Sequence, residues 1–169
     1  MRYVASAFAR CVKADVLPSA ASMRYPVPMT VNDDRVNRFF ETFAGKNATG
    51  DMDGLLRLFA STVMIAGPNG TTALPSNAMA GAIRSRKQRF DALGLPSATV
   101  AQCNATALSD RYTLARAEWR FDLSRLHSES VTLSSTYVLE HSDDGTRIIF
   151  YLNEHDIMAV LRERGIVTE

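Results

Sequence analysis

The chain has few of the residues that build disulfide scaffolds or metal sites. Its 169 residues include two cysteines, Cys11 and Cys103, too few for a disulfide framework or a cysteine-rich zinc site. The three histidines show no His-x-His or His-x-x-x-His spacing, so no metal site is predicted. The glycine-rich loops that hold nucleotide phosphates and the Gly-x-Ser-x-Gly nucleophile elbow are also absent. We therefore expect no metal and no cofactor.

The chain also lacks a strong charge and a long apolar run. Its net charge is +1, which gives no general attraction for nucleic acid or a membrane surface. No apolar run approaches the roughly 20 residues needed to cross a bilayer. One basic cluster is interpreted as the solvated face of a helix, because no aromatic residues are interleaved with it for base stacking: Arg84, Arg86, Lys87 and Arg89. We expect a cytoplasmic protein with no nucleic-acid or membrane partner.

Composition divides the chain near residue 29. Residues 1–29 carry a net charge of +3, residues 30–169 a net charge of −2, and Pro18, Pro26 and Pro28 interrupt any long helix in the first stretch. We interpret residues 1–29 as a poorly ordered extension. A secretory signal, a transit peptide and upstream sequence before a start at Met29 are the alternatives. Residues 30–169 are predicted to form one domain, which is long enough to bury a sizeable core.

Helical periodicity dominates the first part of this domain. Asp51 is expected to cap a short helix, and Ser76 to begin a longer one that ends at Gly94. Between them, the apolar run 63–66 predicts a strand that ends in the turn 67–70. An earlier helix is predicted from apolar residues at the i, i+3, i+4, i+7 spacing: Val36, Phe39, Phe40 and Phe43.

From residue 98 onward, alternating apolar residues predict strands near 98–108, 111–123, 129–141 and 146–154. The Asp144-Gly145 pair before the last strand is typical of a hairpin turn. A final helix is expected after Asp156. This order predicts an α+β fold, a curved antiparallel sheet with helices packed on its concave face.

The inward faces of the later strands supply candidate site residues. Ala115, Ala117 and Trp119 share the core face of one strand, and the two small side chains either admit a helix closely or form the floor of a pocket. Tyr137 is a polar group on an apolar face, and therefore needs a hydrogen-bond partner in the core or in a pocket. On the last strand, Phe150 and Glu154 are expected to share a face, with Glu154 either at a pocket rim or solvated.

The opposite face of the strand at 111–123 is expected to meet solvent or a partner subunit. Its residues alternate in charge: Tyr112, Leu114, Arg116, Glu118 and Arg120. The strand near 98–108 has two faces of similar character, so the pattern alone does not say which one points inward.

The order of elements resembles the nuclear transport factor 2-like superfamily, in its SnoaL-like and ketosteroid isomerase-like branches. The resemblance covers about residues 31–164 and is carried by the segment 50–60 (GDMDGLLRLFA), the strand with Trp119 and the Asp144-Gly145 turn. It implies a cone-shaped, cystatin-like sheet, a pocket between helices and sheet, and a homodimer formed through the outer sheet face.

The catalytic residues of the resembled isomerases are not found at the matching positions. Gly67 stands where their aspartate base precedes a proline, and Phe40 or Phe43 stands where a tyrosine holds the oxyanion. Tyr137, or Thr136 after a shift of one residue, replaces their protonated aspartate. Because proton abstraction needs a base within hydrogen-bond reach of the substrate, isomerase chemistry of this type is not expected.

Three functions stay open. The first is binding of an apolar small molecule. The second is a SnoaL-like enzyme of isomerase, cyclase or dehydratase type acting on an apolar cyclic substrate, with Tyr137 as hydrogen-bond donor and Glu154 as acid or base. The third is a non-catalytic homodimeric assembly module that functions through its outer sheet face. The residues expected to contact a ligand are Phe40, Phe43, Ala115, Ala117, Trp119 and Phe150.

Overall fold

The computed structural model describes residues 30–31, 34–93, 98–122 and 130–166. The expected extension at residues 1–29 lies outside the described residues. Seven strands form one sheet: β1 (Thr30–Val31), β2 (Phe59–Gly67), β3 (Gly70–Pro75), β4 (Thr99–Ala107), β5 (Tyr112–Asp122), β6 (Ser130–Ser142) and β7 (Gly145–Asn153). Their order across the sheet is β1-β4-β5-β6-β7-β2-β3. Neighbouring strands are antiparallel except β2 and β7, which are parallel.

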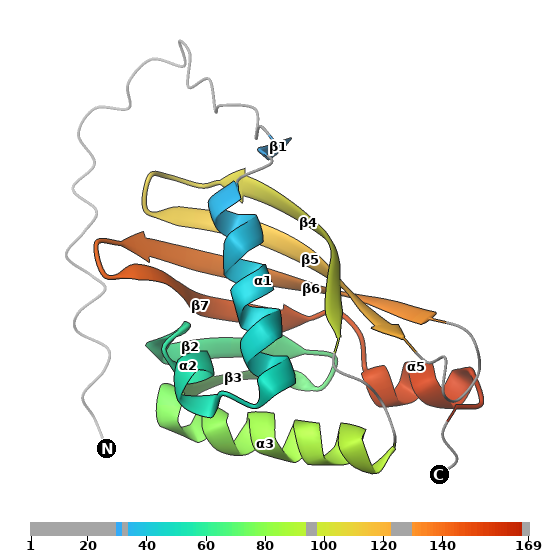
Figure 1. Ribbon diagram of the computed structural model, residues 1–169. Helices are drawn as coiled ribbons and strands as arrows, with labels where there is room; N and C mark the ends of the chain where they lie inside the picture. The colour runs from blue at the N-terminus through green and yellow to red at the C-terminus, as the bar shows by residue number, and fades with distance from the viewer. Residues whose placement is uncertain (1–29, 32–33, 94–97, 123–129, 167–169) are drawn as a thin grey trace, which may run out of the picture.

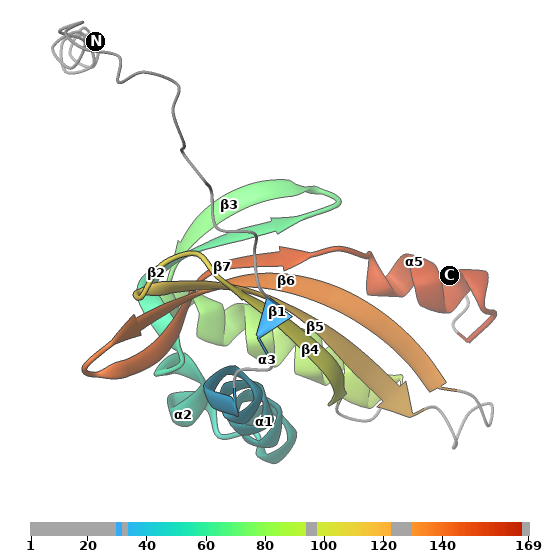
Figure 2. The same cartoon turned by 90° about the horizontal axis from the view of Figure 1, so that it is seen from above.

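Three of the four described helices cover one face of this sheet. They are α1 (Asp34–Thr49), α2 (Met52–Leu56) and α3 (Ser76–Ala92). Figure 1 shows α1 crossing the strands and α3 running below β2 and β3, and the view from above places all three on the same side of the curved sheet (Figure 2). The fourth helix, α5 (Ile157–Glu163), follows β7 at one end of the sheet. The predicted α+β fold is confirmed.

The apolar face of α1 seals the core against the sheet. Its four predicted apolar residues are all buried. The Phe40 ring centroid lies 6.0 Å from that of Trp119 and 4.9 Å from that of Tyr137. Such edge-on and tilted aromatic pairs add roughly 0.5–1.5 kcal/mol each beyond the area they bury. Helical periodicity therefore placed the main helix and its inward face correctly.

The segment after α1 contains one correct prediction and one error. Asp51 caps α2 as expected, since its Oδ1 atom accepts a hydrogen bond from the Gly54 backbone N–H at 2.9 Å. Phe59, however, begins the strand β2 rather than continuing the helix. The hairpin partner β3 was not predicted, because its six residues are almost all exposed and carry no apolar alternation.

A bulge between β6 and β7 reverses the expected face of the last strand. Ile148 is paired with Leu139, whereas Phe150 is paired with the adjacent Val138. One extra residue on β7 therefore turns Phe150 to the outer face of the sheet and Tyr151 to the inner face, opposite Tyr137. The prediction that Phe150 faces the pocket is wrong for this reason.

Candidate functional site

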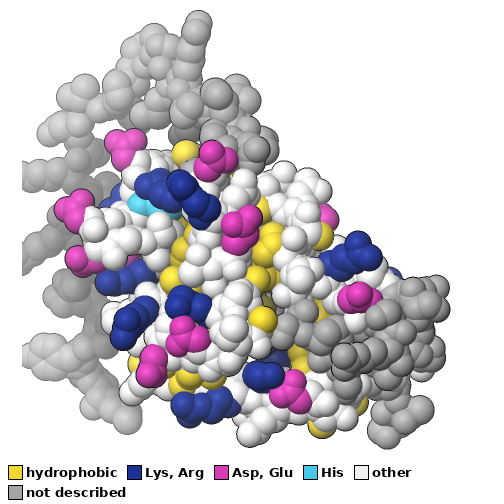
Figure 3. Space-filling view, in the orientation of Figure 1, with side chains coloured by type: hydrophobic (Ala, Val, Ile, Leu, Met, Phe, Trp, Pro, Cys, Tyr) yellow, Lys and Arg dark blue, Asp and Glu magenta, His cyan; other side chains and the backbone are white. Residues whose placement is uncertain are grey.

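An open cavity of about 760 Å³ lies between α3, α5 and the inner face of the sheet. It is formed by the β2–β3 turn, one face of α3, inner residues of β5, β6 and β7, and the first turn of α5. On the side of the molecule seen in Figure 3, basic and acidic side chains are interspersed around apolar side chains that show between the helices. The apolar lining includes Phe43, Phe59, Ile65, Met79, Ile83, Phe90, Trp119, Phe121, Leu133, Ile157 and Met158.

The floor of the cavity is a hydrogen-bonded aromatic cluster. The Trp119 indole N–H donates to the Tyr137 hydroxyl oxygen at 3.1 Å, and the Tyr137 ring stacks on Tyr151 with centroids 5.1 Å apart. Burial raises the pKa of the Tyr137 hydroxyl far above its ordinary value. Tyr137 is therefore a neutral group, able to donate a hydrogen bond but not to act as a base near neutral pH.

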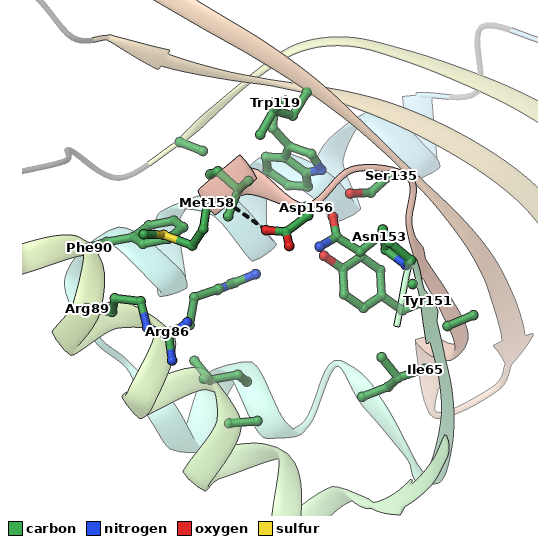
Figure 4. A pocket seen from close by; sticks show the side chains of 18 of the residues that line it. Ile65, Arg86, Arg89, Phe90, Trp119, Ser135, Tyr151, Asn153, Asp156 and Met158 are labelled. Carbon is green, nitrogen blue, oxygen red and sulfur yellow. Dashed lines mark hydrogen bonds between the residues drawn. The ribbon is translucent and has the colours of Figure 1, made fainter. Parts of the chain in front are cut away.

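The polar side of the cavity is built from three separate elements. Arg86 comes from α3, Asn153 from the end of β7 and Asp156 from the residue that caps α5. Figure 4 shows the Arg86 side chain reaching into the cavity opposite Asn153, with the Asp156 carboxylate between them. Asp156 Oδ1 accepts hydrogen bonds from the backbone N–H groups of Met158 at 2.9 Å and Ala159 at 3.2 Å. Its cap role was predicted; its position in the cavity was not.

The structure brings only some of the candidate ligand residues to the cavity. Phe43, Trp119 and Tyr137 line it. Ala115 and Ala117 do not line it; both are fully buried in the hydrophobic core together with Phe40. Of the two interpretations left open for these alanines, the structure supports close packing.

Glu154 lies outside the cavity, on the outer face of the sheet. Its carboxylate accepts hydrogen bonds from Arg116 Nε at 3.1 Å and Nη2 at 3.0 Å, and from the Thr136 hydroxyl at 2.7 Å. The hydrogen bonds from Arg116, followed by that from Thr136, lower the pKa of Glu154. A paired carboxylate on the outer face cannot serve as the acid or base of a reaction in the cavity. The cavity-facing position expected for Glu154 is therefore wrong.

Several lining residues escaped the sequence analysis. Tyr151 and Asn153 were hidden by the bulge that reverses β7, and Arg86 was assigned to a solvated helix face. Gly67, which stands at the position of the isomerase base, does line the cavity but supplies no side chain.

Two further searches of the structure gave no positive result. Among the described residues, no group of three or more His, Cys, Asp and Glu side chains could hold a metal ion. Within those same ranges, no helix combines the length and the apolar character needed to cross a membrane.

Comparison with known families agrees with this architecture. The matching family is described as NTF2-like protein (DUF6841), and its model matches residues 32–156. The chain belongs to this NTF2-like family. The matched range includes every element that lines the cavity up to the cap of α5. No curated protein matches the chain.

Solved structures show the same fold in distant sequences. One is a Nostoc punctiforme protein of unknown function with a cystatin-like fold, 10% identical, with a TM-score of 0.58 over 72% of this chain and 89% of that one. Another is Aln2 from a Streptomyces species, 17% identical, with a TM-score of 0.57 over 76% and 93% of the two chains. An NTF-2 like protein of unknown function from Shewanella oneidensis is 15% identical, with a TM-score of 0.54 over 72% and 98%. At these identities the likeness shows the fold alone.

Proposed function

We propose that this NTF2-like protein binds a small, largely apolar molecule in the cavity between α3, α5 and the sheet. The observation that carries the proposal is the cavity itself, about 760 Å³ with a mostly apolar lining and a few convergent polar side chains. Small-molecule sites are typically concave, roughly 300–1,000 Å³ in volume and built in this way. The aromatic floor of Trp119, Tyr137 and Tyr151 supplies flat apolar surface for a ring or chain.

Binding is favoured over the enzyme alternative by where the ionisable groups lie. Glu154 is committed to Arg116 on the outer face, and Tyr137 stays protonated. Asp156 reaches the cavity, but one of its oxygens already accepts two backbone hydrogen bonds at the start of α5. The pair of residues expected to carry SnoaL-like catalysis is therefore not assembled at the cavity.

The test uses the uncharged fluorescent probe N-phenyl-1-naphthylamine. We expect a saturable rise in probe emission with one site per chain. Excitation of Trp119, the single tryptophan of the chain, should transfer energy to the bound probe because its ring lines the cavity. A probe that gives no saturable signal with the folded protein would contradict the proposed function.

A matched pair of variants assigns the signal to the cavity. Ala82 lines it on the exposed side of α3, whereas Ala78, one turn earlier on the same helix, is exposed and does not. Ala82→Trp should fill part of the volume and weaken probe binding at least about tenfold, which corresponds to roughly 1.4 kcal/mol. Ala78→Trp should leave binding unchanged. Equal affinity in the two variants would place the probe elsewhere.

We also propose that two copies pair through the outer sheet face, as the resemblance implies. A row of apolar residues crosses four strands of this face: Leu114 is paired with Val138, Val138 with Phe150, and Phe150 with Met64. Leu114 is 38% exposed and Met64 48% exposed. A contiguous exposed apolar row of this kind is typical of a surface that meets another protein.

A further inference from the structure

The charged residues around the cavity are unequal in number. Four lining residues are basic and two are acidic, although the whole chain has a net charge of only +1. One pair cancels, since Lys87 Nζ donates to both carboxylate oxygens of Asp91 at 3.0 Å. This leaves three guanidinium groups facing one carboxylate, that of Asp156. The three are Arg86, Arg89 and Arg162.

These three arginines are not paired within the protein. In the part of the chain that the structure describes, no carboxylate oxygen lies within 4.0 Å of a guanidinium nitrogen of Arg86, Arg89 or Arg162, while six other ion pairs form. The negative charge of Asp156 is turned toward the first backbone N–H groups of α5, where a helix start favours an anion. The cavity therefore holds a surplus of positive charge.

Arg86 is the arginine placed to contact a ligand directly. Its side chain extends from α3 into the cavity, toward the side that holds Asn153 and Tyr151 (Figure 4). Its charge reaches the floor, since it favours the ionised form of the buried Tyr137 hydroxyl against the larger opposing effect of burial. A guanidinium presents five N–H donors in a planar fork that matches a carboxylate with two parallel hydrogen bonds.

We infer that the ligand of this cavity is an amphipathic organic acid. Its apolar body lies on the aromatic floor, and its anionic group is held by Arg86. This inference rests on the proposed function and adds the chemical class of the ligand. Arg89 and Arg162 are exposed, so they attract the acid over a distance that salt shortens, to roughly 8 Å at physiological ionic strength. A charge-assisted bond to Arg86 is the stronger contact.

The experiment compares two competitors that differ only in their terminal group. Decanoate and 1-decanol share a ten-carbon chain, but decanoate carries a carboxylate at pH 7.5. Each is titrated against N-phenyl-1-naphthylamine bound to the full chain. We expect decanoate to displace the probe at a concentration at least about tenfold lower than 1-decanol, and we expect this advantage to shrink as salt is raised.

Arg86→Gln and Arg84→Gln form the matched variants. Both arginines are exposed on α3, but Arg84 does not line the cavity, and glutamine keeps the helix propensity of arginine. Arg86→Gln should remove the advantage of decanoate while leaving probe affinity unchanged, and Arg84→Gln should preserve the advantage.

Each other outcome overturns a stated claim. If decanoate and 1-decanol displace the probe equally, the acid inference is wrong while the proposed function stands. If the advantage of decanoate survives Arg86→Gln, the assignment of Arg86 is wrong. If the probe itself fails to bind the wild-type chain, the proposed function falls and the inference falls with it.

Discussion

The indole N–H of Trp119 donates a hydrogen bond to the hydroxyl oxygen of Tyr137 across 3.1 Å, between neighbouring strands in the buried core. Both side chains are at least 90% buried, and the ring of Phe40 packs against both. The bond satisfies the single donor of the indole where no water reaches it. It also fixes the Tyr137 ring against Tyr151, so one polar contact organises the aromatic floor of the cavity.

Removing this hydroxyl should destabilise the fold. Tyr137→Phe leaves the Trp119 N–H without its partner in a buried site, and an unpaired buried donor costs about 1–3 kcal/mol. We expect the free energy of unfolding in urea to fall by that amount. Tyr112→Phe on the outer face is the control and should change it by less than about 0.5 kcal/mol. Equal values for the two variants would mean that the hydrogen bond adds nothing to stability.

Two glycines in helices should respond to alanine with opposite signs. A Cβ at Gly54 would collide with the Asp51 carboxylate and the Lys46 ammonium group, whereas a Cβ at Gly81 would meet nothing within 4 Å. Gly54→Ala should disrupt the cap of α2 and destabilise the protein by about 1 kcal/mol. Gly81→Ala should stabilise α3 by roughly 0.5–1 kcal/mol. Thermal unfolding of both variants checks the signs, and the same sign for both would refute the argument.

The elements fixed by local periodicity could be predicted from the sequence. The inward face of α1 and the buried row of β5 follow from spacings of 3.6 and 2 residues, which depend only on nearby positions. The cap of α2 by Asp51 is equally local. Phe43, Trp119 and Tyr137 reached the cavity because their strands and helix were placed correctly.

The rest of the site depends on tertiary geometry that no local pattern records. The bulge on β7 shifts the strand by one residue, which exchanges Phe150 for Tyr151 and leaves Glu154 on the outer face. Arg86 and Asp156 stand 70 positions apart in the sequence and meet the same cavity only because α3 and α5 flank it. A helix wheel describes Arg86 as solvated, and that description omits the cavity beside it.

The ion pair on the outer face should give acid-sensitive stability. Arg116 and Thr136 lower the folded-state pKa of Glu154 by hydrogen bonding, so the folded chain holds the carboxylate ionised at pH values where the unfolded chain protonates it. This contribution is complete above the unfolded pKa, about 4.3, and is lost as pH falls through the folded pKa.

Glu154→Gln should therefore flatten the acid limb of the stability curve. Because the pair is partly exposed, the loss in unfolding free energy at pH 7 should be below about 1 kcal/mol. Probe binding should not change, since Glu154 lies outside the cavity. Urea unfolding across the acid range tests the first point. A variant that loses probe affinity while keeping its stability would return Glu154 to the binding site.

The apolar row on the outer face predicts the oligomeric state. Burying the row that runs from Leu114 to Met64 against a second copy removes exposed apolar area from water at roughly 25 cal/mol per Å², and a carboxylate placed in the row would have to be desolvated without a partner. Sedimentation velocity should show a dimer for the wild-type chain and a monomer for Leu114→Asp. Leu108, which is 57% exposed beyond the end of β4, lies outside the row, so Leu108→Asp should stay dimeric. A monomeric wild-type chain, or a dimer that survives Leu114→Asp, would show that this face does not pair two copies.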